Sequence, residues 1–213
     1  MAAKKKTGRP GVRAAGRSGR KWADHLTQQA KADNYPARSV YKLEEIQQKF
    51  SIMKKKDTVL DLGCAPGSWL LYASRQVGPE GRVLGIDMKA VDIGLPANVT
   101  VIQDDILTMT DDTFSQQAFG CRVVLSDMAP ATTGRKDVDA FRSFELCKMA
   151  LDVAEQCLGV NGHFVCKIFQ GNEFAQFEKK VKKRFGTCRI FKPESCRKQS
   201  KEIYIIAKNK RQM

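Results

Sequence analysis

The chain has 213 residues, the size of one domain, and 42% of them are hydrophobic, which is enough for a single core and argues against global disorder. It contains 37 Lys and Arg against 23 Asp and Glu, a formal net charge of +14, so a polyanion, above all nucleic acid, is the expected partner. No run of about 18 apolar residues is present, so no membrane span is predicted.

The positive charge is concentrated at the two ends of the chain. Residues 1–21 carry eight basic residues and no acid, residues 178–213 carry 13 basic and 3 acidic residues, and residues 22–177 carry 16 basic and 20 acidic residues. The composition of residues 1–21 predicts a basic disordered tail before a single domain over residues 22–213. We expect the two ends to form an RNA-binding face; the alternative is a solvated surface with extra lysines.

Targeting signals and cysteines both indicate a cytoplasmic protein. The first residues lack the apolar stretch of a secretory signal, and their glycines and Pro10 disfavour the amphipathic helix of a mitochondrial presequence. The seven cysteines include no C-x-x-C pair and mostly lie in apolar runs. They are therefore expected to be reduced core residues, with neither a disulfide framework nor a metal site.

A helical pattern begins near residue 22 and is clearest over residues 39–46, and strands then alternate with helices. Alternation of this kind predicts an α/β, Rossmann-like fold with a mainly parallel seven-stranded sheet and helices on both faces. The last two strands are joined by a short linker, which favours an antiparallel hairpin at one edge. The predicted strands cover residues 58–62, 82–86, 99–103, 121–126, 162–169, 188–192 and 202–208, and the predicted helices after residue 50 cover residues 66–77, 137–158 and 173–185.

Carboxylates stand at the ends of the first four predicted strands. They are Asp61, Asp87, either Asp104 or Asp105, and Asp127. Open parallel sheets bind ligands at the carboxyl ends of their strands, where these side chains would gather. Four acidic ends in succession therefore predict a ligand site at this edge of the sheet.

The loop after the first strand indicates which ligand this edge binds. Its glycines, Gly63 and Gly67, have G-x-x-x-G spacing in place of the dinucleotide fingerprint G-x-G-x-x-G, and Pro66 lacks an N–H, so the loop is a poor phosphate cradle. This argues against a nicotinamide dehydrogenase. The surrounding acids suit a cation, and S-adenosylmethionine fits because it carries a sulfonium and an ammonium but no phosphate. Asp87 is placed to accept both ribose hydroxyls, and Asp104 or Asp105 to face the adenine amino group.

Three charged residues stand out elsewhere. Lys167 lies inside the fifth strand, where an unpaired ammonium is costly to bury. Lys42 lies on the first clear helix, and Glu202 opens the last strand. The alternatives are a lysine that reaches the sheet rim, a solvated helix lysine and an edge-strand charge that hinders aggregation.

Over about residues 20–210 the chain resembles the FtsJ-like RNA 2′-O-ribose methyltransferases. The resemblance rests on residues 37–46 (ARSVYKLEEI), 61–69 (DLGCAPGSW), 126–130 (SDMAP) and 200–204 (SKEIY), together with Lys167. Each segment is moderately specific, and their order and spacing together are highly specific.

The resemblance implies a class I methyltransferase fold, S-adenosylmethionine as cofactor and, from the size of the chain, the single-domain bacterial branch that acts on a uridine ribose of large-subunit ribosomal RNA. The family's catalytic tetrad falls on Lys42, Asp127, Lys167 and Glu202. Asp104, beside Asp105, departs from the family pattern. The family's cofactor residues fall on Gly67, Trp69, Asp87, Asp105 and Asp127, and the loop adds Asp61, Gly63 and Pro66 to the expected contacts.

The implied reaction transfers a methyl group in line from a sulfonium to a ribose 2′-hydroxyl. Lys167 would accept or guide the hydroxyl proton, provided that burial and the Lys42 cation lower its pKa. Asp127 and Glu202 would oppose that shift while holding the lysine in place. The sequence leaves open whether Lys167 accepts the proton as a general base or only guides it.

Two further questions are open. Trp22, Tyr35, Tyr41 and Arg38 either stack on nucleotides or, for the aromatic rings, pin the first helix to the core. A transfer RNA methyltransferase would share every motif, and a non-catalytic ribosome-assembly protein is the alternative from another functional class. The protein is expected to be a monomer.

Overall fold

The structure is a computed structural model that describes residues 17–106, 118, 120–197 and 199–212, with only the backbone of residues 17–24. Helices and strands alternate along most of the chain, as predicted. They are α1 (Arg17–Ala32), α2 (Val40–Phe50), β1 (Thr58–Leu62), α3 (Ser68–Val77), β2 (Arg82–Asp87), β3 (Val99–Gln103), β4 (Cys121–Ser126), α5 (Lys136–Cys157), β5 (Leu158–Phe169), α6 (Phe174–Arg184), β6 (Phe185–Phe191) and β7 (Glu202–Lys210).

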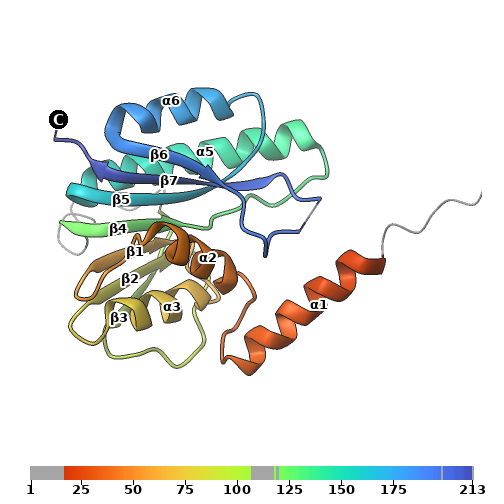
Figure 1. The fold of residues 1–213 in the computed structure, drawn as a ribbon, viewed down its shortest axis with the longest axis horizontal. Helices are drawn as coiled ribbons and strands as arrows, with labels where there is room; N and C mark the ends of the chain where they lie inside the picture. Colours follow the sequence, from red (N-terminus) through yellow and green to blue (C-terminus); the bar gives the residue numbers. More distant parts are fainter. Residues whose placement is uncertain (1–16, 107–117, 119, 198, 213) are drawn as a thin grey trace, which may run out of the picture.

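The strands of the described residues form one seven-stranded sheet in the order β3-β2-β1-β4-β5-β7-β6 (Figure 1). Neighbours among β1 to β5 pair in parallel, whereas β7 is antiparallel to both β5 and β6. The predicted mainly parallel sheet with an antiparallel edge hairpin is confirmed. The change of direction at β7 brings the start of that strand to the same edge as the end of β5.

Helices cover both faces of the sheet, which explains why the strands are continuous apolar runs. On β1, Val59 packs into the cluster that contains α2 and α3, while Leu60 and Leu62 pack into the cluster that contains α5 and α6. Figure 1 shows these pairs of helices on opposite sides of the sheet, and α1 reaching out from the body. The predicted tail overlaps α1 from Arg17 onward, and its residues 1–16 lie outside the described part.

Two strands begin earlier than the sequence predicts. β5 starts at Leu158, directly after α5, where prediction placed a helix end followed by a turn. The pairing register with β4 shifts between Cys121 and Val123, and Asn161 has a positive φ of 63°. The turn predicted at Asn161-Gly162 is therefore an irregularity within β5, and the strand does not end there. Similarly, β6 starts at Phe185, directly after α6.

The two tyrosines near α2 are anchored in the body. Both are buried; Tyr41 Oη donates a hydrogen bond of 2.7 Å to Asp33, and Arg75 donates one of 2.7 Å to Tyr35 Oη. The Arg75 guanidinium also lies 4.6 Å from the centre of the Tyr35 ring. This packing agrees with the reading in which the rings pin the first helices to the core.

The cysteines lie where their sequence context predicted. Six of the seven are buried and none forms a disulfide, and Cys188 is half-buried. Within the described residues there is no cluster of three metal-ligating side chains. In the same part of the chain, no helix has the length and apolar character needed to cross a membrane.

Buried His163, on β5, makes the fold sensitive to acid. Burial lowers its pKa to about 4, and its Nδ1 accepts a hydrogen bond from the Asn209 backbone N–H at 3.3 Å, which needs the neutral ring. The unfolded chain takes up this proton near pH 6.5, so stability falls as pH drops from about 6.5 toward 4. Lowering the pH from 7 to 5 should cost up to about 2 kcal/mol of unfolding free energy through this group.

Urea unfolding at the two pH values measures this loss. His163→Asn should remove that part of the pH dependence, and His25→Asn, at an exposed position, should keep it. An unchanged pH dependence in His163→Asn would contradict the assignment.

Candidate active site

The parallel strands bring the predicted carboxylates to one edge, at two depths. Asp61 pairs with Gly85 on β2 and with Leu125 on β4. Asp87 and Asp127 therefore lie two residues further along their strands than the level of Asp61. Asp61 is inside the sheet, whereas the other two carboxylates stand at its edge.

Asp61 is a buried acid without a partner. Its side chain is 0% exposed, and neither carboxylate oxygen has a hydrogen-bond partner. Burial, then the negative charges of Asp127 and Asp87, raise its pKa well above the ordinary value. Because an unpartnered buried carboxyl is costly, this position suits a bound cation or donor.

The loop after β1 comes very close to its neighbours. Gly63 and Gly67 have φ values of 77° and 104°, a region in which a side chain is strained. A Cβ on Gly63 would lie 2.5 Å from Met128 Cγ, and one on Gly67 would lie 2.6 Å from Ile93 Cδ1. The loop is thus held against the segments that follow β4 and β2, and Pro66 is exposed on it.

Asp87 ties this loop to the end of β2. Its Oδ2 accepts a hydrogen bond from the Ala65 N–H at 2.9 Å, and its Oδ1 accepts one from the Lys89 N–H at 2.8 Å. After β3, Asp104 is exposed and accepts a hydrogen bond from the Asp105 N–H at 2.7 Å, whereas Asp105 is half-buried. Asp105 is therefore the more enclosed of the two candidate adenine contacts.

Trp69 has a structural role at the start of α3. Its indole is 3% exposed, and its Nε1 donates a hydrogen bond of 2.8 Å to the Ser39 carbonyl. Next to it, Ser68 Oγ donates to the Ala37 carbonyl at 3.0 Å and accepts from the Ala37 N–H at 2.8 Å. These bonds fix the segment before α2 on α3. Because the indole N–H is already used, the backbone N–H of Trp69, in the first turn of α3, is the donor of this residue that could face a ligand.

The four predicted tetrad residues come together as two ion pairs. Lys42 Nζ, from α2, lies 2.5 Å from Glu202 Oε1 at the start of β7. Lys167 Nζ, from β5, lies 3.0 Å from Asp127 Oδ1 after β4, and also donates a hydrogen bond to the Asp127 carbonyl. All four side chains are largely buried, which excludes the solvated and rim-seeking alternatives for these lysines.

Tyr204 joins the two pairs, and the sequence analysis did not include it among the site residues. Its hydroxyl lies 2.6 Å from Asp127 Oδ1 and 2.9 Å from Glu202 Oε1. Burial, followed by these two negative charges, raises its pKa well above the ordinary value, so it keeps the proton that it donates. The available signal was its spacing of two from Glu202, which places both on one strand face. In the sheet it lies directly opposite Lys167.

Opposite charges keep Asp127 and Lys42 ionised. Burial acts to raise the pKa of Asp127, but the Lys167 and Lys42 cations and the Tyr204 hydrogen bond outweigh it and lower that pKa. Burial acts to lower the pKa of Lys42, but Asp127 and Glu202 outweigh it and raise that pKa. At neutral pH the site therefore contains an ammonium and a carboxylate held by hydrogen bonds beside the acidic edge.

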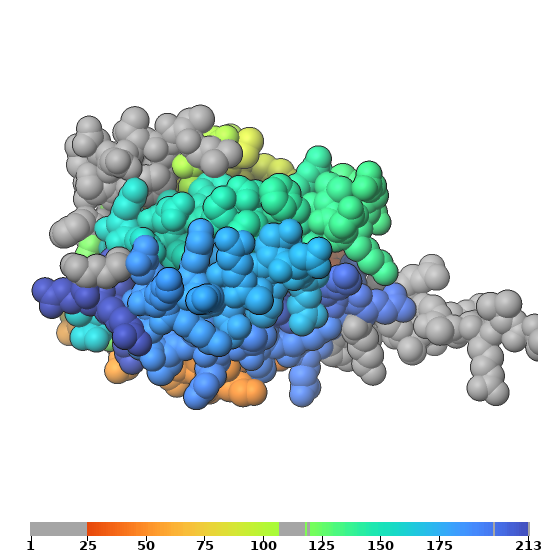
Figure 2. All heavy atoms as spheres, turned by 90° about the horizontal axis from the view of Figure 1, so that it is seen from above, coloured from red at the N-terminus to blue at the C-terminus, as the bar shows by residue number. Residues whose placement is uncertain are grey.

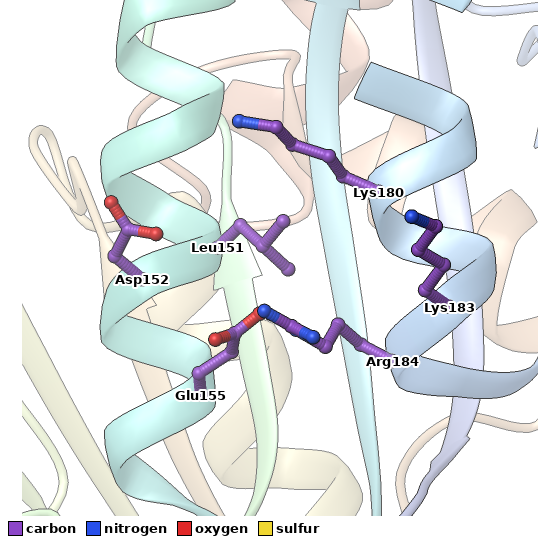
Figure 3. A pocket seen from close by; sticks show the side chains of 6 residues that line it. All are labelled: Leu151, Asp152, Glu155, Lys180, Lys183 and Arg184. Carbon is purple, nitrogen blue, oxygen red and sulfur yellow. The ribbon is translucent and has the colours of Figure 1, made fainter. Parts of the chain in front are cut away.

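A separate hollow of about 280 Å³ lies between α5 and α6 (Figure 3). Acidic and basic side chains line it together, and Arg184 Nε forms an ion pair of 2.5 Å with Glu155. Arg184 and Glu155 are thus already paired within the protein. None of the predicted site residues lines it.

This fold, with an acidic edge that disfavours phosphate and a lysine–carboxylate set beside it, defines an S-adenosylmethionine-dependent methyltransferase. The chain matches the FtsJ-like methyltransferases over residues 35–210 and belongs to that family. The family expected from the motifs is confirmed.

Close relatives share most of the chain. A protein of Desulforapulum autotrophicum named ribosomal RNA large subunit methyltransferase E is 58% identical over 190 residues, which is 89% of this chain and 94% of the relative. A protein of the same name from Desulfosudis oleivorans is 50% identical over 194 residues, covering 91% and 94%.

Solved structures agree with the fold. A ribosomal RNA methyltransferase from Plasmodium falciparum superposes with a TM-score of 0.72 at 30% identity, over 83% of this chain and 98% of that chain. An rRNA methylase from Clostridium thermocellum, with a TM-score of 0.55 at 19% identity over 78% and 96%, shares the fold.

Proposed function

We propose that this enzyme methylates the 2′-hydroxyl of a uridine ribose in large-subunit ribosomal RNA. The observation that carries the proposal is the pair of ion pairs, joined by Tyr204, beside the acidic edge of the sheet. The names of the close relatives favour ribosomal over transfer RNA as the substrate. We place the reaction in the cytoplasm, with the protein acting as a monomer.

The residues at the acidic edge fit S-adenosylmethionine. Asp61 offers an unpartnered carboxyl to a cationic ligand, and Asp87 has further lone pairs for a ribose diol. Gly63 and Gly67 hold the loop tightly against the segments that follow β4 and β2, and half-buried Asp105 is the proposed adenine contact. Pro66 and the Trp69 N–H complete the proposed cofactor contacts together with Asp127. When bound, the cofactor supplies a methyl group on a positively charged sulfur.

The protein's own contribution is to position and deprotonate the hydroxyl. Two contacts to Asp127 hold Lys167 Nζ in place, so its remaining position can meet the ribose oxygen. The bound cofactor would supply the methyl group for the ribose 2′-oxygen, and Lys167 would accept or guide the proton that this oxygen loses. Lys42 and Glu202 close the other side of this centre, and fixed geometry supplies much of the rate.

Tyr204→Phe should lower kcat about tenfold, because Asp127 and Glu202 lose the one O–H donor that they share while both ion pairs stay. Cofactor affinity and the KM for RNA should be nearly unchanged, as expected for a positioning residue. Tyr72→Phe, at another buried tyrosine, is the matched control. A variant with wild-type kcat would contradict the positioning role.

The substrate is tested by transfer of radiolabelled methyl groups. Assembled large subunits, free large-subunit ribosomal RNA and transfer RNA are prepared from cells that lack the enzyme, and each is offered separately. Mass spectrometry of the labelled RNA should find a 2′-O-methyluridine in the ribosomal RNA. Labelling of transfer RNA alone would favour the alternative substrate, and binding of ribosomal RNA without any transfer would favour the assembly-protein alternative.

The basic face of the molecule formed by α6 is proposed to contact RNA phosphates. Four lysines of α6 are exposed, and Figure 2 shows α6 at the centre of this face, with α5 above it in the view. Contacts of this type raise affinity without reading sequence. The lysines are Lys179, Lys180, Lys182 and Lys183.

A further inference from the structure

Three buried residues of α5 form hydrogen bonds through their side chains at intervals of four residues: Asp139, Ser143 and Cys147. They are 9%, 1% and 1% exposed. Residues four apart lie one above the other on a helix, so the three form a stripe along α5. Because a buried polar group is costly unless it is hydrogen-bonded, the partners of this stripe show what it holds in place.

Two members of the stripe bind the backbone at the end of β5. Ser143 Oγ accepts a hydrogen bond of 3.0 Å from the Phe169 N–H, and Cys147 Sγ donates one of 3.0 Å to the Lys167 carbonyl. The Cys166 thiol also lies 3.5 Å from this carbonyl. The strand is therefore held by α5 at Lys167 itself and again two residues further on.

The end of β5 needs these bonds because β4 is shorter. β4 ends at Ser126, which pairs with Cys166, so Lys167 and the rest of β5 extend beyond it. The Lys167 carbonyl and the Phe169 N–H belong to alternate residues, so they point to the same side of the strand. Buried backbone groups require partners, and here the side chains of α5 provide them in place of a neighbouring strand.

The first member of the stripe holds the neighbouring loop. Asp139 Oδ1 accepts hydrogen bonds from the Thr133 N–H at 2.7 Å and from Thr133 Oγ1 at 2.9 Å, and its Oδ2 accepts one from the Gly134 N–H at 3.2 Å. This loop begins at Asp127, the carboxylate that pairs with Lys167. One face of α5 therefore holds the backbone on both sides of that ion pair.

We propose that Ser143 and Cys147 are positioning residues for methyl transfer, which act by fixing the backbone at Lys167. The inference rests on the proposed function, because it takes Lys167 as the group that meets the ribose hydroxyl. A lysine ammonium stands on a flexible stem, so a shift of its backbone changes where Nζ can reach. A misplacement of about 1 Å can cost about 100-fold in rate, so loss of these bonds should affect the chemical step.

The test measures single-turnover methyl transfer to unmethylated large-subunit ribosomal RNA at saturating RNA and cofactor. Ser143→Ala should lower the rate about tenfold, with KM for RNA and S-adenosylmethionine affinity within about twofold of wild type. Cys147→Ala should lower it about threefold, because a thiol is a weak donor. Cys147→Ser keeps a donor at the same place and should bring the rate back to within about twofold of wild type.

Two control variants separate positioning from stability. Ser74→Ala removes a hydroxyl of α3 that donates a hydrogen bond of 2.7 Å to Asn98 Oδ1, and Cys157→Ala removes a buried thiol at the other end of α5. Urea unfolding should show that each control loses about as much stability as its counterpart in the stripe. Both controls should nevertheless transfer the methyl group at the wild-type rate.

A wild-type rate in Ser143→Ala or in Cys147→Ala would overturn the inference for that residue. It would also be overturned if the rate fell equally in the matched controls, since stability alone would then explain the loss. Weaker binding of RNA or cofactor at an unchanged rate would likewise exclude a positioning role. Failure of the proposed function has a different signature, because the wild-type enzyme would then not methylate RNA.

Discussion

Lys167→Ala should abolish methyl transfer, with kcat lowered by at least about 10³-fold, while S-adenosylmethionine still binds. A positioned group that guides or accepts a proton contributes about 10²- to 10⁴-fold, and no other described lysine or arginine forms an ion pair with Asp127. Cofactor affinity should be retained because the ribose and loop contacts proposed for Asp87 lie at β2, away from Lys167. Single-turnover methyl transfer and calorimetry measure the two effects separately.

Further variants separate a loss of catalysis from a loss of folding. Lys167→Met fills the buried position with an uncharged stem and should be as inactive as Lys167→Ala. Lys56→Ala, at an exposed lysine paired with Glu80, should be fully active. Lys42→Ala and Glu202→Ala should lose activity by smaller but clear factors. Near-normal turnover in Lys167→Met would refute the catalytic assignment of this lysine.

The central strands β1 and β4 were predictable to the residue because each is largely buried and reads as a short apolar run between turn signals. The edge strand β3, which is only partly buried, also has the predicted bounds. The starts of β5 and β6 were not predictable, since each strand follows a helix without a loop, and the Asn161-Gly162 turn signal is absorbed by an irregular pairing with β4. Local sequence cannot show that a turn will lie within a strand.

The site could be predicted in its members but not in its connections. The family resemblance indicated the two lysines and two carboxylates, but which lysine pairs with which carboxylate depends on the strand order β4-β5-β7 and on the antiparallel register that places Tyr204 opposite Lys167. Tyr204 in a strand motif reads as an ordinary core residue. Its role emerges only when both carboxylates are brought to its hydroxyl.

The uneven charge of the chain has a structural explanation. The acidic middle of the sequence supplies an edge where Asp61 is buried without a partner. This destabilising position lies at the proposed site of a cationic cofactor. The basic end supplies Arg197 and the exposed lysines of α6. The two requirements meet at the tetrad, where each lysine lies against a carboxylate.

Asp87→Ala should weaken S-adenosylmethionine binding by about 100-fold or more. The carboxylate is proposed to accept both ribose hydroxyls, and two charge-assisted hydrogen bonds together account for roughly this factor. It also accepts the Ala65 and Lys89 N–H groups, so the alanine variant releases the loop that forms the rest of the cofactor site. Isothermal titration calorimetry measures the affinity, and maximal turnover at saturating cofactor should be far less affected.

Asp87→Asn separates the two contributions. The amide oxygen can still accept from one backbone N–H, so the loop keeps an anchor, but the neutral side chain is a weaker acceptor for a diol. Its affinity should therefore lie between those of wild type and Asp87→Ala. Asp92→Ala, which removes an exposed carboxylate from the segment after β2, should bind as wild type does and thereby exclude a general effect of net charge. If Asp87→Ala binds S-adenosylmethionine with wild-type affinity, the ribose is held by other residues. A rearranged loop could not replace the Asp87 contacts to the ribose and to the backbone at the same time.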